Sequence, residues 1–149
     1  MMNRYGIQAT IAPIAEALQA GDIDRSGGKR VVLIVEGERL SADTWSAIFR
    51  LHGYKVLTAY DGVTGFTLAQ QNSPDLLITG LRMWGMNGVE LAILVRDAIQ
   101  QCKILLFAGQ SADEMLAEAE AMGYEFQMVS RPIHPTKMLE RAAAWLQVA

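Results

Sequence analysis

Short apolar runs typical of β-strands alternate five times with segments of helical periodicity between residue 29 and the end of the chain. The first run, Val31–Val35, is wholly aliphatic, as expected of a strand that is buried on both faces. Short connections between such strand and helix units favour a parallel sheet covered by helices on both sides. The sequence therefore predicts an α/β fold.

The predicted elements follow one another in strict alternation. Strands are expected at residues 31–35, 54–58, 76–79, 104–107 and 126–129. Helices are expected at residues 40–52 and 61–71, from the turn at 84–88 to about 99, at 111–122, and from about 135 onward. Apolar residues at helical spacing predict the core-facing stripes, which include Leu40 and Leu51 in the first helix and Ala143 in the last.

Two helix starts carry capping signals. Asp61 is expected to cap the second helix, and Ser111 with Glu114 is expected to form a capping box on the fourth. The whole pattern predicts a flavodoxin-like (βα)5 three-layer sandwich with strand order 2-1-3-4-5. In such a sheet a functional site lies at the carboxyl ends of the strands, where the loops leave the sheet.

Composition bounds the class of protein. The chain has 149 residues, 51% of them hydrophobic and 19% charged, which suits one folded domain. A net charge of −3 offers no basic surface for nucleic acid. The apolar runs fall short of the roughly 18 residues that span a membrane. Cys102 is the sole cysteine, which excludes an internal disulfide, and we expect a cytoplasmic protein.

The chain divides into residues 1–28, an N-terminal helix and linker, and residues 29–149, the main domain. Ile11, Ile14 and Leu18 recur at helical spacing and predict a short amphipathic helix. Residues 21–29 are polar and rich in glycine, which is typical of a linker. The extra helix is open to two interpretations, a disordered tail or a docking or dimerisation helix.

The segment 74–88, PDLLITGLRMWGMNG, resembles the segment around the phosphate-accepting aspartate of bacterial response-regulator receiver domains. Three further segments match in register, namely Gly53-Tyr54, Ala59-Tyr60-Asp61-Gly62 and Arg131-Pro132-Ile133. The resemblance covers about residues 29–149. It implies a cytoplasmic signalling domain of the fold predicted above.

The resemblance also implies which positions formed the phosphorylation site, and most of them have changed. Gly80 stands at the acceptor aspartate, and Glu36 and Gly37 stand at the two acidic residues that hold magnesium. Ala108 stands at the threonine or serine that contacts the phosphoryl group, and Arg131 stands at the lysine. Glycine cannot accept a phosphoryl group, and arginine is a planar fork rather than a compact ammonium. We therefore expect no catalytic residue, no metal site and no cofactor.

Other candidate residues have simpler interpretations. Glu38 could serve as a substitute metal ligand, but an acidic side chain at a helix entry is expected to face solvent. Asp75 lies at the far end of its strand, Asp61 caps a helix, and Thr79 points to the other side of the sheet from Gly80, so none is a good substitute acceptor.

The switch that normally follows phosphorylation is altered as well. Met128 occupies the position of the aromatic that follows the hydroxyl in receivers, and Phe126 is the nearest aromatic. Trp84 stands where the family usually has proline, and could plug the vacant site or serve as a protein-contact anchor.

Two structural predictions follow from the altered site. Without metal and phosphate, Glu36 and Arg131 would each be an uncompensated charge at one end of the sheet, so we expect them to pair, with Arg82 as a competitor. The resemblance also implies a cis peptide bond between Arg131 and Pro132.

The predicted function is a phosphorylation-independent pseudo-receiver that acts as a protein-interaction or regulatory module. Its protein partner is unknown, a homodimer is possible, and neither nucleic acid nor membrane is expected as a partner. Two alternatives remain open, a small-molecule-binding domain that uses the vacant pocket and an atypical receiver phosphorylated elsewhere. An enzyme is disfavoured, because no glycine-rich phosphate loop, Cys-His pair or Ser-His-Asp constellation is apparent.

Overall fold

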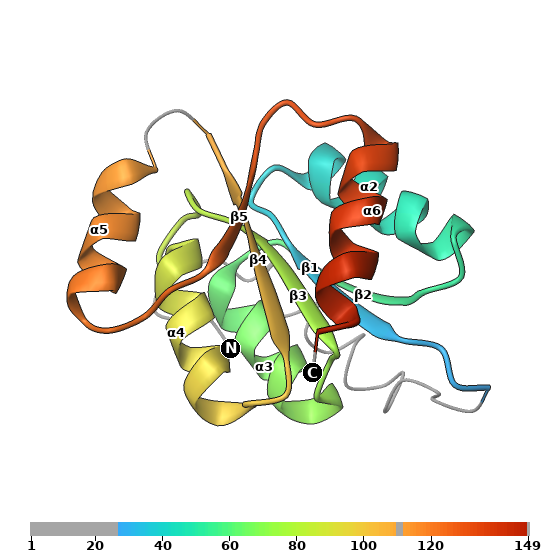
Figure 1. The fold of residues 1–149 in the computed structure, drawn as a ribbon, viewed down its shortest axis with the longest axis horizontal. Helices are drawn as coiled ribbons and strands as arrows, with labels where there is room; N and C mark the ends of the chain where they lie inside the picture. The colour runs from blue at the N-terminus through green and yellow to red at the C-terminus, as the bar shows by residue number, and fades with distance from the viewer. Residues whose placement is uncertain (1–26, 110–111, 149) are drawn as a thin grey trace, which may run out of the picture.

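The computed structural model describes residues 27–109 and 112–148. The predicted N-terminal helix lies outside these residues, as does Ser111. Five parallel strands form one sheet in the order β2-β1-β3-β4-β5, which confirms the predicted flavodoxin-like topology. Figure 1 shows the sheet in the middle of the molecule with helices on both of its faces.

Strands and helices alternate along the described chain. The strands are β1 Val31–Val35, β2 Lys55–Ala59, β3 Leu76–Gly80, β4 Lys103–Ala108 and β5 Gln127–Ser130. The helices are α2 Arg39–Leu51, α3 Gly62–Asn72, α4 Gly88–Ala98, α5 Asp113–Ala121 and α6 Pro135–Leu146. The observed bounds lie within about two residues of those predicted, which is ordinary for element ends.

Alternate residues of the sheet supply two separate cores. Leu33 and Val35 of β1 pack into the core shared with α3, α4 and α5. Val32 and Ile34 pack into the core shared with Phe49 of α2 and with α6. Because side chains alternate between the faces of a strand, a strand buried on both sides must be apolar throughout, as β1 is.

Helix starts are fixed by side-chain caps at several places. Asp61 accepts a hydrogen bond from the backbone N–H of Thr64, 2.8 Å away, which confirms it as the cap of α3. Asn87 and Glu90 form a reciprocal capping box on α4 that was not predicted. Ala112 occupies the N-cap of α5 and makes no capping hydrogen bond, while the predicted box of Ser111 with Glu114 lies partly outside the described residues.

Three residues assigned to core-facing stripes lie on the surface instead. Leu40 is 73% exposed and Leu51 is 83% exposed on α2, and Ala143 is exposed on α6. Helix α2 has two lines of residues at helical spacing. The line that faces the sheet contains Ala42, Ser46 and Phe49. Sequence periodicity shows that a stripe exists but does not say which side of the helix faces the sheet.

Within residues 27–109 and 112–148, no helix combines the length and the apolarity that crossing a membrane requires. Cytoplasmic localisation stays a prediction.

Candidate functional site

The candidate site lies at the carboxyl ends of the central strands, where four of the predicted site residues meet. Glu36 follows β1, Gly80 ends β3, Ala108 ends β4, and Arg131 follows β5. The parallel register sets these strand ends side by side, and the backbone N–H of Arg131 donates to the carbonyl of Ala108 at 3.0 Å. Gly37 is the next residue after Glu36 and is exposed.

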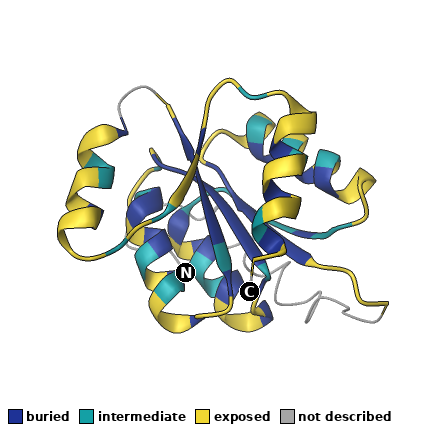
Figure 2. Cartoon of the chain, in the orientation of Figure 1, coloured by how far each residue is buried: buried dark blue, intermediate teal, exposed yellow. Residues whose placement is uncertain are grey.

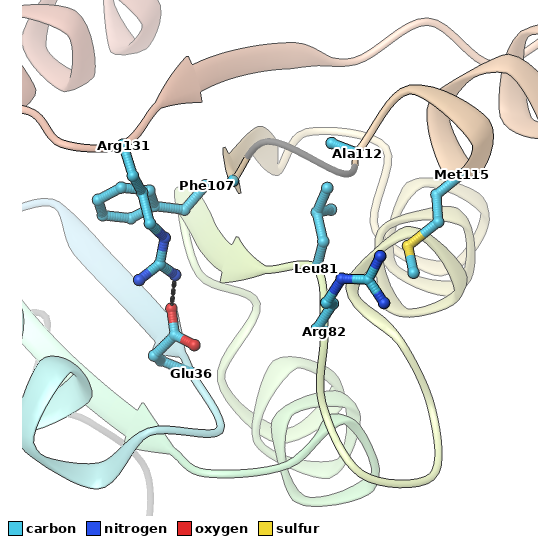
Figure 3. Close-up of a pocket in the computed structure, with 8 residues that line it drawn as sticks. Glu36, Leu81, Arg82, Phe107, Ala112, Met115 and Arg131 are labelled. Carbon is cyan, nitrogen blue, oxygen red and sulfur yellow. Dashed lines mark hydrogen bonds and ion pairs between the residues drawn. The ribbon is translucent and has the colours of Figure 1, made fainter.

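The side chains of Glu36 and Arg131 form a direct ion pair, as predicted. Figure 3 shows the guanidinium of Arg131 facing the carboxylate of Glu36 across the pocket wall. The Glu36 side chain is 9% exposed and the Arg131 side chain is 35% exposed. A pair that is half-shielded from water is held more firmly than a surface pair, where screening leaves little net attraction.

Phe107 fixes the other side of the arginine. Its ring centroid lies 4.1 Å from the Arg131 Cζ, a cation–π distance. Phe107 belongs to β4 and is itself buried, with Trp45 packed against it edge-on. The guanidinium is therefore held between a carboxylate and an aromatic face, and the sequence analysis had not anticipated this second contact.

The carboxylate of Glu36 occupies the space that a side chain at position 80 would need. A Cβ atom added to Gly80 would lie 2.7 Å from each carboxylate oxygen of Glu36. Real Cβ atoms essentially never approach other atoms so closely, so a side chain at position 80 would require the Glu36 carboxylate to move. Gly80 thus does more than remove an acceptor, because it makes room for the neighbouring carboxylate.

A second glycine keeps the loop after β3 closed. A Cβ atom added to Gly88 would lie 1.8 Å from the carbonyl oxygen of Gly80. The N–H of Gly88 also donates to the carbonyl of Leu81 at 2.8 Å. Gly37 is different, because an added Cβ would meet the Met83 side chain at an ordinary 3.5 Å. Gly88 is required by packing, whereas Gly37 is not.

A pocket of about 380 Å³ opens beside the ion pair. Its lining comes from several strand ends and from α5, namely Glu36, Leu81, Arg82, Phe107, Gly109, Ala112, Met115 and Arg131. In Figure 3 the side chain of Arg82 points toward Met115, on the opposite wall from Glu36. Glu36 forms its ion pair with Arg131.

The donor set at this site does not fit the magnesium ion that receiver domains hold. Magnesium takes near-octahedral oxygen coordination with at least one or two free carboxylates. Here Gly37 and Gly80 offer no side chain, and the carboxylate of Glu36 is paired with Arg131. Glu38 accepts a hydrogen bond from the Ser41 N–H and caps α2, as an exposed acidic residue at a helix entry should. Among the described residues, no group of three or more metal-binding side chains is found.

None of the remaining candidates lines the pocket. Trp84 is 57% exposed and lines a second hollow of about 460 Å³ with Arg82 and Gly37. Met128 is 36% exposed on β5. Phe126 stacks on Tyr124 with 6.1 Å between the ring centroids. Trp84 therefore lies beside the pocket without filling it.

The substitute acceptors weighed from the sequence lie elsewhere. Asp75 accepts from the N–H of Val31 at 2.8 Å, at the amino end of the sheet. Thr79 is fully buried, and its hydroxyl donates to the carbonyl of Gly80. Asp61 serves the cap of α3. None of the three side chains is among the residues that line the pocket.

Two details near the last helix complete the geometry. The peptide bond between Arg131 and Pro132 is cis, as predicted. His134 accepts a hydrogen bond from the Thr136 N–H and caps α6.

Comparisons with known proteins agree with this fold. A sequence model described as the response regulator receiver domain matches residues 32–143. The chemotaxis protein CheY4 of Vibrio cholerae is 25% identical, with a TM-score of 0.71 over 79% of this chain and 99% of that one. A two-component transcriptional regulator of Clostridium phytofermentans is 26% identical, with a TM-score of 0.69 over 80% and 94%. A CheY-like receiver protein of Methanospirillum hungatei has a TM-score of 0.74 over 80% and 94%, and at 20% identity it is similar in fold.

Proposed function

The chain belongs to the response regulator receiver domain family, and from this premise we propose that it acts as a pseudo-receiver, a regulatory module that binds a protein partner without being switched by phosphorylation. The observation that carries the proposal is the position of the Glu36 carboxylate. It lies where a side chain at position 80 would lie, and it is neutralised by Arg131.

This arrangement supplies within the chain what phosphate and metal would supply from outside. In a receiver the developing negative charge must be stabilised by cations placed around the acceptor. Here a permanent carboxylate already lies beside the permanent cation of Arg131. Ala108 has no hydroxyl with which to follow a change of charge at the site. The domain is thereby held in one state, and any regulation acts through the amount of protein or through its binding partner.

The proposal predicts that phosphoryl donors leave the protein unchanged. The full chain is incubated with acetyl phosphate and magnesium, and its intact mass is compared with that of a phosphorylatable receiver treated in parallel. Gly80→Asp serves as the matched variant. It should remain unmodified too, because the added side chain would meet both oxygens of Glu36 and would be a second acid with no hydroxyl partner at Ala108.

A stoichiometric, acid-stable and base-labile adduct on the natural chain would refute the proposal. Peptide mapping would then locate the acceptor, which would support the alternative of an atypical receiver phosphorylated elsewhere. An adduct on Gly80→Asp alone would refute the narrower claim that the Glu36–Arg131 pair blocks the site.

The pocket favours a second candidate function, the binding of a small anionic molecule. About 380 Å³ is enough for a metabolite, and two of the lining residues, Arg82 and Arg131, are cationic. Against it, every buried side-chain nitrogen and oxygen in the described part of the chain has a hydrogen-bond partner, so no polar group there waits for a ligand. Native mass spectrometry separates the two functions, since a retained ligand that Arg82→Ala abolishes would favour small-molecule binding.

A further inference from the structure

The outer side of α2 carries an apolar stripe that points away from the sheet. Leu40, Thr44, Ala47 and Leu51 follow one another at spacings of four, three and four residues, and all four are exposed. Such spacing places them in one line along a helix, as in the seam of a coiled coil. The opposite side of α2 holds the buried residues that pack on the sheet.

Two large residues at the ends of this stripe and two small ones in its middle form a self-complementary shape. If a second α2 lies antiparallel with its centre opposite the centre of the first, Leu40 meets Leu51 of the other copy and Thr44 meets Ala47. The small central pair lets the backbones approach closely. Leu40 and Leu51 are the two most exposed large hydrophobic residues in the described part of the chain, which makes their burial the main gain.

Charges beside the stripe also distinguish the two possible directions. Asp43 and Arg50 lie on the same flank of the stripe, seven residues apart. In an antiparallel pair this flank faces its own copy, so Asp43 of one chain lies near Arg50 of the other, twice over. In a parallel two-fold pair this flank would instead face the other flank of the partner helix, so Asp43 and Arg50 would lie on opposite sides of the seam from their copies and would form no such ion pairs. The flank therefore favours the antiparallel direction.

Both charged side chains are already held in position on their own chain. Asp43 accepts a hydrogen bond from the hydroxyl of Tyr60, whose ring lies 3.9 Å from the Arg39 Cζ. Arg50 donates to the carbonyl of Val56 at 3.3 Å. A fixed side chain loses less rotamer freedom on binding, so the charges are preorganised for a partner.

We propose that the outer stripe of α2, defined by Leu40, Thr44, Ala47 and Leu51, is a docking surface for the same stripe of a second copy of this chain, in antiparallel orientation about a two-fold axis. The inference rests on the proposed function, since it names the partner of a domain that works through contacts. The two remain separable, because a failure to dimerise would leave the phosphorylation result untouched.

The size of the surface sets the expected strength. Twelve residues of helix span roughly 16 Å, which gives an interface well below the standard size for stable complexes. We therefore expect a reversible dimer with a dissociation constant on the order of 100 µM. Sedimentation equilibrium of the full chain across a concentration range around that value measures it directly.

The first test removes the stripe. Leu40→Glu combined with Leu51→Glu should raise the dissociation constant at least tenfold. Val63→Glu combined with Met122→Glu is the matched control, because these residues are also exposed and lie on other elements, and it should leave association unchanged. Both pairs are exposed, so thermal unfolding of each double variant should stay close to that of the natural chain.

The second test asks for direction. Asp43→Lys should weaken association, and so should Arg50→Glu, while the two together should restore it because the charges are exchanged on both copies. Disulfide cross-linking tests the orientation of the two helices. When the Leu40→Cys and Leu51→Cys variants are mixed under oxidised glutathione, they should form an intermolecular disulfide with each other. Each variant incubated alone should form little disulfide. Cys102 is buried and does not interfere.

Several results would overturn the proposal. A chain that stays monomeric well above 100 µM would refute it. The same result is expected if residues 1–26 cover the stripe instead of a second copy. A dimer that persists in Leu40→Glu combined with Leu51→Glu would place the interface elsewhere. Cross-linking of each single-cysteine variant with itself would show a parallel pair and refute the antiparallel arrangement.

Discussion

Two regions of the molecule differ sharply in how many of their residues are buried, namely β1 with α4 and β5 with α5. All five residues of β1 are buried, and α4 contributes five buried residues. At the edge of the sheet, by contrast, only Val129 is buried in β5 and only Ala119 in α5. Figure 2 shows the contrast, with dark central strands and a largely yellow α5.

This difference explains how the candidate site is built. Glu36 comes from the buried part, at the end of β1, and Arg131 comes from the exposed part, after β5. With little apolar burial to hold β5 and the loop that follows it, polar contacts take a larger share. The ion pair, the Phe107 contact and the hydrogen bond from Arg131 to Ala108 supply them. The site therefore fastens the less buried edge of the sheet to its centre.

The largest effect is expected in the buried part, at Gly88. Gly88→Ala should destabilise the domain by more than about 4 kcal/mol, because the new Cβ would lie 1.8 Å from a backbone oxygen that no rotamer change can move. Gly109→Ala is the control, since nothing lies within 4 Å of its added Cβ. Urea unfolding measures both. A tolerated Gly88→Ala would show that the loop after β3 shifts easily.

The next effect compares equivalent truncations on the two sides. Leu91→Ala in α4 should cost about 3 kcal/mol, because Leu91 is fully buried. Leu116→Ala in α5 should cost only about 1 kcal/mol, because Leu116 is half-buried. Equal losses in chemical denaturation would contradict the contrast between the two parts.

The Glu36–Arg131 ion pair should make an intermediate contribution to the free energy of unfolding. Arg131→Ala should destabilise by about 1–3 kcal/mol, because it leaves the nearly buried Glu36 carboxylate without its cation. Glu36→Gln and the double variant complete a double-mutant cycle that isolates the coupling. Arg141→Ala is the control, an exposed arginine that donates to the Met128 carbonyl. Additive effects of Arg131→Ala and Glu36→Gln would mean that the pair contributes nothing.

The smallest expected effect is on the pH dependence of stability, and it again contrasts a buried group with an exposed one. Burial, and next the charge of Asp75, raises the pKa of the Cys102 thiol to about 12, from an ordinary value near 9. The unfolded thiol therefore loses its proton first, and the stability that is complete below pH 9 falls as pH rises toward 12. Between pH 8 and pH 10 we expect a loss of about 1 kcal/mol that Cys102→Ala lacks.

Tyr124 offers the comparison on the exposed side. Its hydrogen bond to Asp97 raises the pKa of its hydroxyl, yet this hydrogen bond is exposed to solvent, so no measurable change in stability should follow from Tyr124→Phe over the same range. An identical pH dependence of the natural chain and Cys102→Ala would refute the burial argument.

The sequence was sufficient for the fold and for the charges at the site. Alternating periodicity predicted every strand, the flavodoxin-like fold supplied the strand order, and the unbalanced Glu36 and Arg131 predicted their contact. The sequence was insufficient where one apolar pattern is compatible with two orientations of a helix. Leu40 and Leu51 fit a helical stripe equally well inside or outside the domain. The position of the Glu36 carboxylate over Gly80 depends on backbone spacing between two strands, which no local pattern contains.

The Glu36–Arg131 contact joins residues that are 95 positions apart, so it closes nearly the whole domain into one loop. Closing so long a loop early would be entropically unfavourable, and the contact can form only after β1 and β5 both lie in the sheet. It is therefore made late in folding. Its loss should speed unfolding and leave the folding rate nearly unchanged. The pair thus governs how long the folded domain lasts once formed, rather than how readily it forms.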